Sequence, residues 1–288
     1  MKNIIWLASY PKSGNTWLRV FLTNLLREDD EPADINRLDR TPIASARAVF
    51  DDAVGFEAAD LSLDEVDRLR PEVYEHISNQ ANETRFFKIH DAYTYIDDCP
   101  GKPLVSFNAT RGAVYIIRNP LDVTVSFANH LNTTIDKAVE RMAEEDFCFS
   151  HQPGRLHEQL RQRLLSWSGH VRSWTGAEGL EVHVMRYEDM KQRPEETFTR
   201  AVQFAGLEKS RAQIEKALKF SRFSEMQRQE NEKGFKEKPL QAQVFFYKGE
   251  VGVWRELLNG SQVKKIIAAH GDVMKRFGYL DQKGEPVF

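Results

Sequence analysis

The segment "IIWLASYPKSGNTWLRVFLTNLL" constrains the fold of this chain more than any other part of the sequence. An apolar run stops at Pro11, and apolar residues resume after Thr16 with helical spacing. The pattern predicts a buried strand over residues 3–9, a tight turn, and a helix over residues 16–28. A strand, a turn and a helix in this order are typical of α/β folds with a parallel sheet.

The turn has the character of an anion site. The first N–H groups of a helix lack partners inside the helix, and the helix dipole favours negative charge at that end. Gly14 lets the backbone approach a ligand closely. Lys12 adds a charge, and donors come from Ser13, Asn15 and Thr16. The turn therefore predicts a bound phosphate or sulfate; the alternative is an ordinary capped helix start with a solvated lysine.

The usual triphosphate-binding loop, G-x-x-x-x-G-K-[ST], is absent. The turn has one glycine, and Lys12 precedes it. No downstream aspartate is placed in an obvious position for magnesium, so we expect a site that needs no metal. Cys99 and Cys148 do not form a short-spaced metal pair, and we expect both to be free thiols.

Strand-like and helix-like segments alternate along the chain, which predicts one α/β domain over residues 1–288 with a central parallel sheet flanked by helices. Ser62 and Glu65 form a predicted capping box, and Pro71 predicts either a break in the helix that follows or the first turn of a second helix. Strands are predicted at 3–9 and 112–120, within 84–93 with an end near Lys88-Ile89-His90, and within 180–190, where the strand runs into a turn. Helices are predicted at 16–28, from 62, from 121, and at 134–145, 156–175, 194–205, 210–219 and 261–277. Residues 29–60 and 228–250 are expected to be mobile surface loops.

The composition excludes some classes of partner. The net charge of −3 gives no overall basic character of the kind that bulk nucleic-acid binding requires. No segment approaches the ~18 apolar residues of a membrane-spanning helix. The apolar run at the amino terminus is too short for a signal peptide. We expect a cytoplasmic protein with no nucleic-acid or membrane partner.

Four segments together resemble the cytosolic sulfotransferase family, whose donor is 3′-phosphoadenosine 5′-phosphosulfate (PAPS). They are "YPKSGNTWL", "YIIRNPLDVTVSFANH", "RYEDM" and "FYKGEVGVW", and they follow one another in the family's order. The resemblance implies the P-loop-kinase-like sulfotransferase fold, PAPS as donor with 3′,5′-adenosine bisphosphate as product, and sulfuryl transfer without a metal.

The resemblance also implies which residues bind the donor. The first segment is similar to the family's 5′-phosphosulfate loop, and the second to its 3′-phosphate motif. The implied donor site consists of Lys12, Ser13, Gly14, Asn15, Thr16, Trp17, Arg118, Ser126, Tyr187, Ser221, Phe223, Tyr247, Lys248 and Gly249. The last segment departs from the family, because Tyr247 and Val253 stand where an arginine and an aspartate are usual.

Simpler roles remain open for some of these residues. The guanidinium of Arg118 suits bidentate binding of phosphate, but it would also pair with the nearby Asp122. Trp17 and Phe223 would serve as planes for the adenine base, or they would pack into the core as helical aromatic residues usually do.

The segment "FKIHDAY" predicts the catalytic groups. Lys88 and His90 are two residues apart, so on a strand they share a face. Histidine titrates near neutral pH and suits a general base, and the family has the same Lys-x-His pattern. Lys12 and Lys88 would neutralise charge during an in-line displacement. His130 is the second candidate for the base.

Three functions therefore stay in consideration. The first is sulfuryl transfer from PAPS to a hydroxyl, phenol or amine of a small-molecule acceptor, in a monomer or homodimer. The others are a nucleotide or small-molecule kinase and a non-catalytic nucleotide-binding protein. The acceptor site is expected among the loops 29–60, 91–108 and 228–247, where Phe235, Phe245 and Phe246 predict a lid with an apolar inner face.

Overall fold

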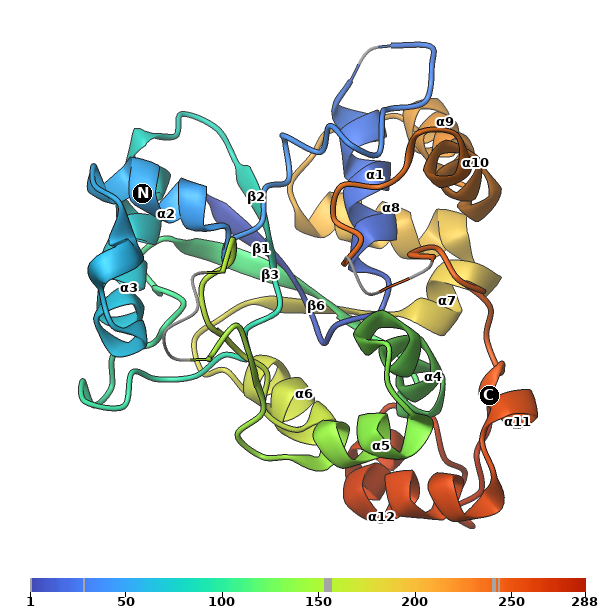
Figure 1. Ribbon diagram of the computed structural model, residues 1–288. Helices are drawn as coiled ribbons and strands as arrows, with labels where there is room; N and C mark the ends of the chain where they lie inside the picture. The colour runs from blue at the N-terminus through green and yellow to red at the C-terminus, as the bar shows by residue number, and fades with distance from the viewer. Residues whose placement is uncertain (1, 28, 153–156, 240–241, 243) are drawn as a thin grey trace. The chain divides into compact units, whose positions relative to one another are not determined.

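The computed structural model describes residues 2–27, 29–152, 157–239, 242 and 244–288 (Figure 1). Contacts divide the chain into two compact units. Unit 1 comprises Met1–Tyr10, Arg40–Tyr115 and Glu145–Val184, and unit 2 comprises Pro11–Asp39, Ile116–Glu144 and Met185–Phe288. The single domain over 1–288 stays a prediction.

A four-stranded sheet has the order β2-β1-β3-β6. Its strands are β1 (Ile4–Ser9), β2 (Arg85–Ile89), β3 (Thr110–Ile117) and β6 (Val182–Arg186). Strands β1 and β2 pair in parallel, with Leu7 opposite Lys88. Every residue of β1 is buried, as its uninterrupted apolar run predicts. The α/β class with a central parallel sheet and flanking helices is confirmed.

Unit 1 packs helices against this sheet through aromatic side chains. The ring of Tyr74 meets Trp6 of β1 edge to face at 4.9 Å, and Trp174 stacks on Tyr115 of β3 at 6.4 Å. Such pairs add about 1 kcal/mol each beyond the area they bury. The further elements of unit 1 are α2 (Arg47–Val54), η1 (Ala58–Asp60), α3 (Leu63–Gln80), β4 (Cys148–Phe149), β5 (Gln162–Arg163) and α6 (Trp167–Thr175).

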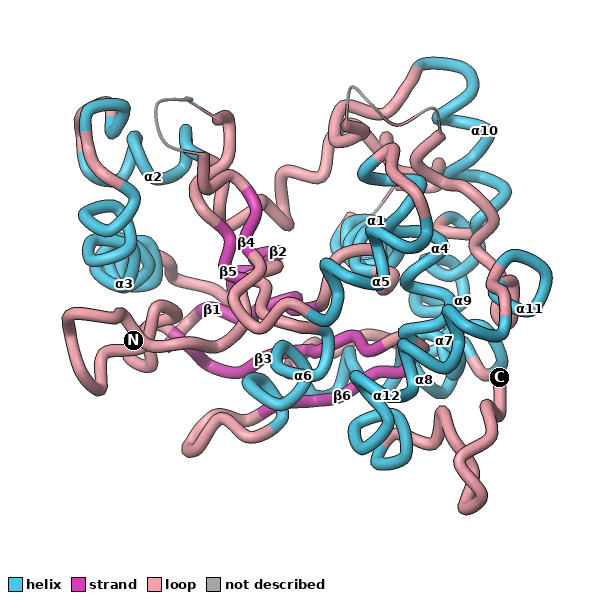
Figure 2. The backbone as a smooth tube through the Cα atoms, turned by 60° about the horizontal axis from the view of Figure 1, so that its bottom comes forward, coloured by secondary structure: helices cyan, strands magenta, loops and turns pink. Residues whose placement is uncertain are grey.

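Unit 2 is mostly helical. Figure 1 shows α1 beside α8 and α9, and Figures 1 and 2 show α4 beside α5. Helix α12 contacts both α4 and α5. Phe21 of α1 packs against Phe198 of α8 at 4.4 Å between ring centroids. The helices of unit 2 are α1 (Asn15–Leu26), α4 (Pro120–Leu131), α5 (Ile135–Ala143), α7 (Tyr187–Gln192), α8 (Pro194–Phe204), α9 (Arg211–Phe220), α10 (Phe223–Lys233), α11 (Trp254–Leu257) and α12 (Gly260–Arg276).

Two predicted helix boundaries are wrong. The helix expected over 156–175 begins only at Trp167, because 162–163 form the short strand β5; residue 156 lies outside the described residues. Helix α3 does begin with the predicted capping box but continues through Pro71. The side chains of Arg70 and Tyr74 on either side of that proline are buried, and this packing outweighs the lost backbone hydrogen bond.

The two segments expected to be loops contain helices. Helix α2 lies within 29–60, where Phe50 buries its ring, and α10 extends to Lys233 inside 228–250. Their mobility stays a prediction, and residues 240–241 and 243 lie outside the described residues, as does residue 28 at the end of the first predicted helix.

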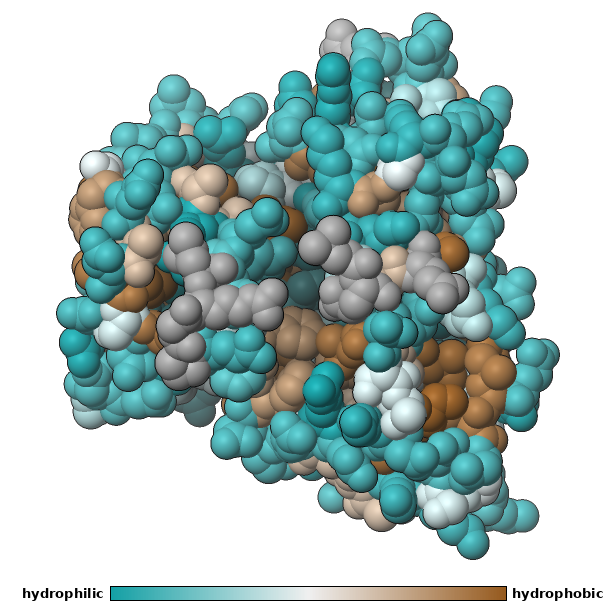
Figure 3. All heavy atoms as spheres, in the orientation of Figure 1, coloured by the Kyte–Doolittle hydropathy of each residue, from teal (hydrophilic) through white to brown (hydrophobic). Residues whose placement is uncertain are grey.

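The face of the protein seen in Figure 3 is covered mainly by hydrophilic residues, with hydrophobic residues in smaller areas. Among the residues that the structure describes, no helix combines the length and hydropathy needed to cross a bilayer. Cys99 and Cys148 are both free, as the sequence predicts.

Candidate active site

The turn after β1 has the conformation of an anion-binding loop. Lys12 and Gly14 both have positive φ, at 67° and 107°, while Ser13 lies between them. Alternating backbone of this kind turns successive N–H groups toward one point. Helix α1 begins at Asn15, with the amide of Trp17 bonded to the carbonyl of Gly14 at 3.0 Å. The loop belongs to unit 2.

Several buried polar atoms in unit 2 are suited to bind an anionic ligand. Ser13 Oγ, Trp17 Nε1 and Arg118 Nε are buried and make no hydrogen bond within the described part of the chain. Burying such groups without partners is unfavourable by about 1–3 kcal/mol each. Asn15 and Thr16 are also buried, on the first turn of α1. These positions carry donors that a phosphate or sulfate oxygen would satisfy.

Arg118 follows the end of β3 and is only 7% exposed. It donates to the carbonyl oxygens of Lys12 at 3.2 Å and Glu250 at 2.9 Å. Its guanidinium lies 4.2 Å from the ring centroid of Tyr187, in a cation–π contact. Asp122, the alternative partner, instead accepts two backbone N–H groups, from Gly252 and Trp254.

Tyr187 connects the turn to the late Lys-Gly-x-x-Gly-x-Trp segment. Its hydroxyl donates to the carbonyl of Gly249 at 2.7 Å, and its ring meets Trp17 edge to face at 6.0 Å. A Cβ atom on Gly14 would lie 2.7 Å from the Tyr187 ring, so only glycine fits there. Burial raises the pKa of Tyr187, and nearby Arg118 opposes that rise, so the hydroxyl stays protonated and donates.

The remaining predicted donor residues of unit 2 are spread around this cluster. Phe223 packs directly on Gly249, since a Cβ there would lie 2.3 Å from its ring. Lys248 pairs with Glu256 at 3.5 Å, whereas Tyr247 is exposed. Ser221 is fully buried and donates to the carbonyl of Leu218 at 3.3 Å. Ser126 lies half-buried on α4, and His130 lies near the end of the same helix.

A contact to Lys12 was not predicted from the sequence. Lys12 Nζ lies 3.8 Å from the ring centroid of Phe245. Glu230 fixes the segment that carries this ring, because its carboxylate accepts the amides of Phe245 at 2.7 Å and Phe246 at 2.9 Å. The predicted apolar lid residues Phe235, Phe245 and Phe246 do pack together, with ring centroids 4.7–5.4 Å apart, and they join a buried cluster of unit 2.

His90 stands directly after β2 in unit 1, half-buried. Its Nδ1 lies 2.7 Å from the carbonyl oxygen of Ser9 and 3.4 Å from the Ser9 hydroxyl. Because a carbonyl only accepts, Nδ1 carries the proton and the basic lone pair lies on Nε2. Lys88, two residues earlier and within β2, is 8% exposed.

Buried polar groups hold the backbone at His90. His170 Nε2 donates to the His90 carbonyl at 3.0 Å, while its Nδ1 accepts from the Tyr115 hydroxyl at 2.8 Å. Burial lowers the pKa of His170 to about 4, against the opposing effect of its hydrogen bond to the His90 backbone. The carboxylate of the neighbouring Asp91 accepts hydrogen bonds from Nη1 and Nη2 of Arg70, at 3.1 and 2.7 Å.

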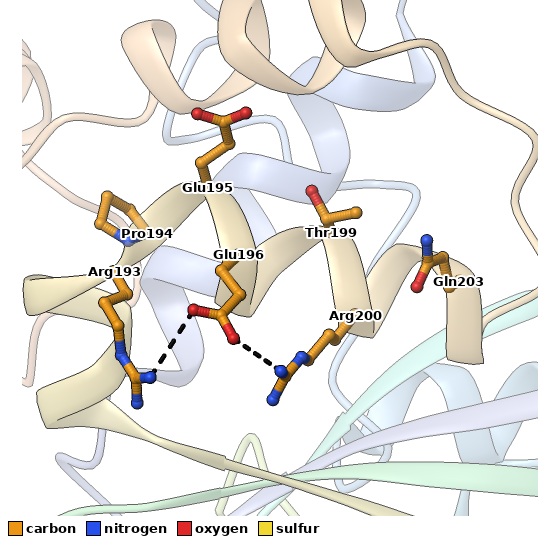
Figure 4. Close-up of a pocket in the computed structure, with 7 residues that line it drawn as sticks. All are labelled: Arg193, Pro194, Glu195, Glu196, Thr199, Arg200 and Gln203. Atoms are coloured by element: carbon orange, nitrogen blue, oxygen red, sulfur yellow. Dashed lines mark ion pairs between the residues drawn. The ribbon is translucent and has the colours of Figure 1, made fainter.

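A surface groove of about 690 Å³ lies along α8 in unit 2. Figure 4 shows Glu196 in this groove between Arg193 and Arg200, with which it forms ion pairs of 3.6 and 2.6 Å. None of the predicted site residues lines it. For the residues the structure describes, no cluster of three or more His, Cys, Asp or Glu is arranged to hold a metal ion.

Comparison with known proteins identifies similar chains. The family model described as "Sulfotransferase domain" matches residues 2–278. The flavonol 3-sulfotransferase of Flaveria bidentis is 24% identical, over 92% of this chain and 79% of that protein. Cytosolic sulfotransferase 1 of Arabidopsis thaliana is 26% identical, over 91% and 76%. The crystal structure of mouse sulfotransferase SULT7A1 complexed with PAP aligns with a TM-score of 0.62 at 18% identity, covering 99% of this chain and 87% of that one.

Proposed function

This chain belongs to the sulfotransferase domain family and is a PAPS-dependent sulfotransferase, and from that premise we propose the roles of its residues. PAPS supplies the sulfuryl group that is transferred. We propose that the acceptor is a small molecule with a hydroxyl, phenol or amine group, as the name of the flavonol sulfotransferase suggests for that relative.

The donor site we propose lies in unit 2. Ser13 and the helix start at Asn15 and Thr16 would bind the phosphosulfate, with Lys12 contributing its charge. Arg118 and Ser126 would bind the 3′-phosphate. The single observation that carries this proposal is that Ser13 Oγ and Arg118 Nε are buried without hydrogen-bond partners in the described part of the chain.

The base of the adenine would contact aromatic residues. We propose Trp17, Tyr187 and Phe223 for this role, with Ser221 beside them. Trp17 and Phe223 are each only partly buried against the cluster of unit 2, so part of each ring stays available. The late segment would contribute the backbone of Gly249 and the charge of Lys248, while Tyr247 does not replace the missing arginine charge.

In unit 1 we propose His90 as the general base. With its proton held on Nδ1 by the Ser9 carbonyl, Nε2 would accept the proton that the acceptor loses as it attacks sulfur. Lys88 and Lys12 would stabilise negative charge on the transferring group. His130 remains the alternative base.

We also propose a monomeric or homodimeric state and a cytoplasmic location. The name of the Arabidopsis relative suggests this location.

Calorimetry tests the donor site directly. We expect 3′,5′-adenosine bisphosphate to bind without added metal, and ATP with magnesium to bind at least about tenfold more weakly. ATP binding that requires magnesium would favour the kinase instead. Tight bisphosphate binding without transfer to any hydroxyl, phenol or amine in a labelled-donor screen would favour the non-catalytic nucleotide-binding protein.

A further inference from the structure

We propose that Asp122 is a positioning residue that gives the donor site its selectivity for a 3′-phosphate. It would do so by holding residues 249–254 against the start of α4. The inference depends on the proposed donor site, because it assigns the 3′-phosphate to Arg118.

Asp122 is a fully engaged, buried carboxylate. It is 1% exposed and lies in the first turn of α4, where the helix dipole favours a negative charge. One oxygen, Oδ2, accepts the amide of Gly252 at 2.8 Å, and the other, Oδ1, accepts the amide of Trp254 at 3.0 Å. Charge-assisted hydrogen bonds of this kind are stronger than those between neutral groups.

The same segment faces Arg118 and Tyr187 a few residues earlier. The Glu250 carbonyl accepts from Arg118 at 2.9 Å, and the Gly249 carbonyl accepts from the Tyr187 hydroxyl at 2.7 Å. Asp122 anchors the far end of this segment, so its two hydrogen bonds determine where the two carbonyls lie. Those carbonyls in turn hold the planes of Arg118 and Tyr187 in contact.

The arrangement also keeps Arg118 available. A carboxylate paired with Arg118 would compete with a phosphate for the same guanidinium. The carboxylate of Asp122 accepts hydrogen bonds from two backbone amides. Arg118 donates to neutral carbonyls, which are weaker partners than a phosphate dianion. Its buried Nε has no partner among the described residues. Arg118 is therefore already oriented for a 3′-phosphate, and its present hydrogen bonds to neutral carbonyls compete with that phosphate only weakly.

The test compares two probes that differ only in the 3′-phosphate: 3′,5′-adenosine bisphosphate and adenosine 5′-monophosphate. Asp122→Asn keeps the shape of the side chain but replaces one acceptor by a donor, which cannot bond an amide N–H. In this variant we expect the ratio of the affinity for the bisphosphate to the affinity for the monophosphate to be lower than in the wild type by about tenfold or more. The affinity for the monophosphate should change by less than about twofold, which a general loss of structure would not spare.

Asp136→Asn is the matched control, because Asp136 is also in the first turn of a unit 2 helix and also accepts a hydrogen bond, from Gln262 at 3.1 Å. We expect the control to keep the wild-type ratio. If Asp122→Asn keeps the wild-type ratio of the affinities for the bisphosphate and the monophosphate, the inference is wrong and the proposed donor site is not affected. Equal affinity of the wild-type protein for both probes contradicts the proposed donor site, and the inference falls with it.

A second variant serves if Asp122→Asn does not fold. Asp122→Glu keeps the charge but moves the carboxylate by one methylene, so it cannot meet both amides in the same geometry. Its ratio should fall below that of the wild type. An unchanged ratio in a folded Asp122→Glu protein, with the Gly252 and Trp254 amides exchanging hydrogen faster than in the wild type, also overturns the inference.

Discussion

The Nδ1 atom of His90 lies 2.7 Å from the carbonyl oxygen of Ser9, across the parallel pair of strands β1 and β2. This hydrogen bond fixes the tautomer of the imidazole and leaves the basic nitrogen, Nε2, on the other side of the ring. The last residue of one strand therefore orients the residue that follows the next strand. The sheet register determines where the two strand ends lie, and therefore where the ring stands relative to the Ser9 carbonyl.

We predict that His90→Asn lowers the turnover of sulfuryl transfer by at least about 100-fold. The asparagine amide can still donate to the Ser9 carbonyl, but it cannot accept a proton at neutral pH. Affinity for 3′,5′-adenosine bisphosphate should stay within about twofold, as measured by calorimetry. His76→Asn, on the exposed face of α3, is the control. Turnover near the wild-type value in His90→Asn would remove His90 from the role of base and bring His130 forward.

We predict that Arg118→Ala weakens binding of the bisphosphate by about tenfold to 100-fold, because a charged hydrogen bond to phosphate contributes about 1.5–3 kcal/mol. Arg118→Lys should recover only part of this affinity, since an ammonium group lacks the bidentate fork. Arg200→Ala on α8 removes an exposed arginine of the same unit and serves as control. Unchanged bisphosphate affinity in Arg118→Ala would exclude the arginine from the donor site.

The sequence was sufficient for the strands of the central sheet, because each of them follows from a local pattern, whereas the residues of the site stay a prediction. The buried run Ile4–Ser9, the glycine after Lys12 and the capping box at Ser62 each determine structure within a few residues. Helix α3 shows the limit of such rules, because Pro71 is tolerated through the burial of its neighbours, and no local pattern contains that information.

Long-range contacts of the site could not be predicted either. The ring of Phe245 over Lys12 and the amides bonded by Asp122 join segments more than a hundred residues apart in sequence. The sequence offered Asp122 only as a partner for Arg118, since the two are four positions apart. In the folded chain Asp122 bonds two backbone amides instead. Almost every residue type has such an amide, so the sequence does not show which ones will bond.

We predict that Gly14→Ala disrupts the donor site through a steric clash. The added Cβ would lie 2.7 Å from the Tyr187 ring, in addition to the strain of a positive φ of 107°. Gly55→Ala separates the two effects, because Gly55 also has a positive φ, of 79°, but no atom within 4 Å of the added Cβ. Gly55→Ala should cost only the strain, about 1 kcal/mol of unfolding free energy. Gly14→Ala should lose more stability and also bisphosphate affinity. Equal effects of the two variants in denaturant unfolding and calorimetry would contradict the clash.

Finally, we predict that His170 makes the protein less stable in mild acid. Its pKa is about 4 in the folded protein, chiefly because burial disfavours the imidazolium, and about 6.5 in the unfolded chain. Between these values the unfolded chain binds the proton and the folded protein does not. The free energy of unfolding therefore falls as the pH is lowered from about 6.5 toward 4, by about 3 kcal/mol in total from this residue. Above pH 6.5 the residue contributes no pH dependence. The groups around the ring are the Tyr115 hydroxyl, the Tyr10 ring and the His90 carbonyl.

Replacing His170 by Gln tests this. The glutamine amide can still donate to the His90 carbonyl but does not titrate, so the variant should lose that part of the pH dependence even if it is less stable at pH 7. Urea unfolding of both proteins at several pH values between 4.5 and 7.5 measures the slope directly. The two slopes should diverge only on the acidic side. If the unfolding free energies of the two proteins changed in parallel with pH over the whole range, the pKa of His170 would not be lowered in the folded protein. The imidazole would then be protonated at acidic pH, and its Nδ1 would have to donate to the Tyr115 hydroxyl.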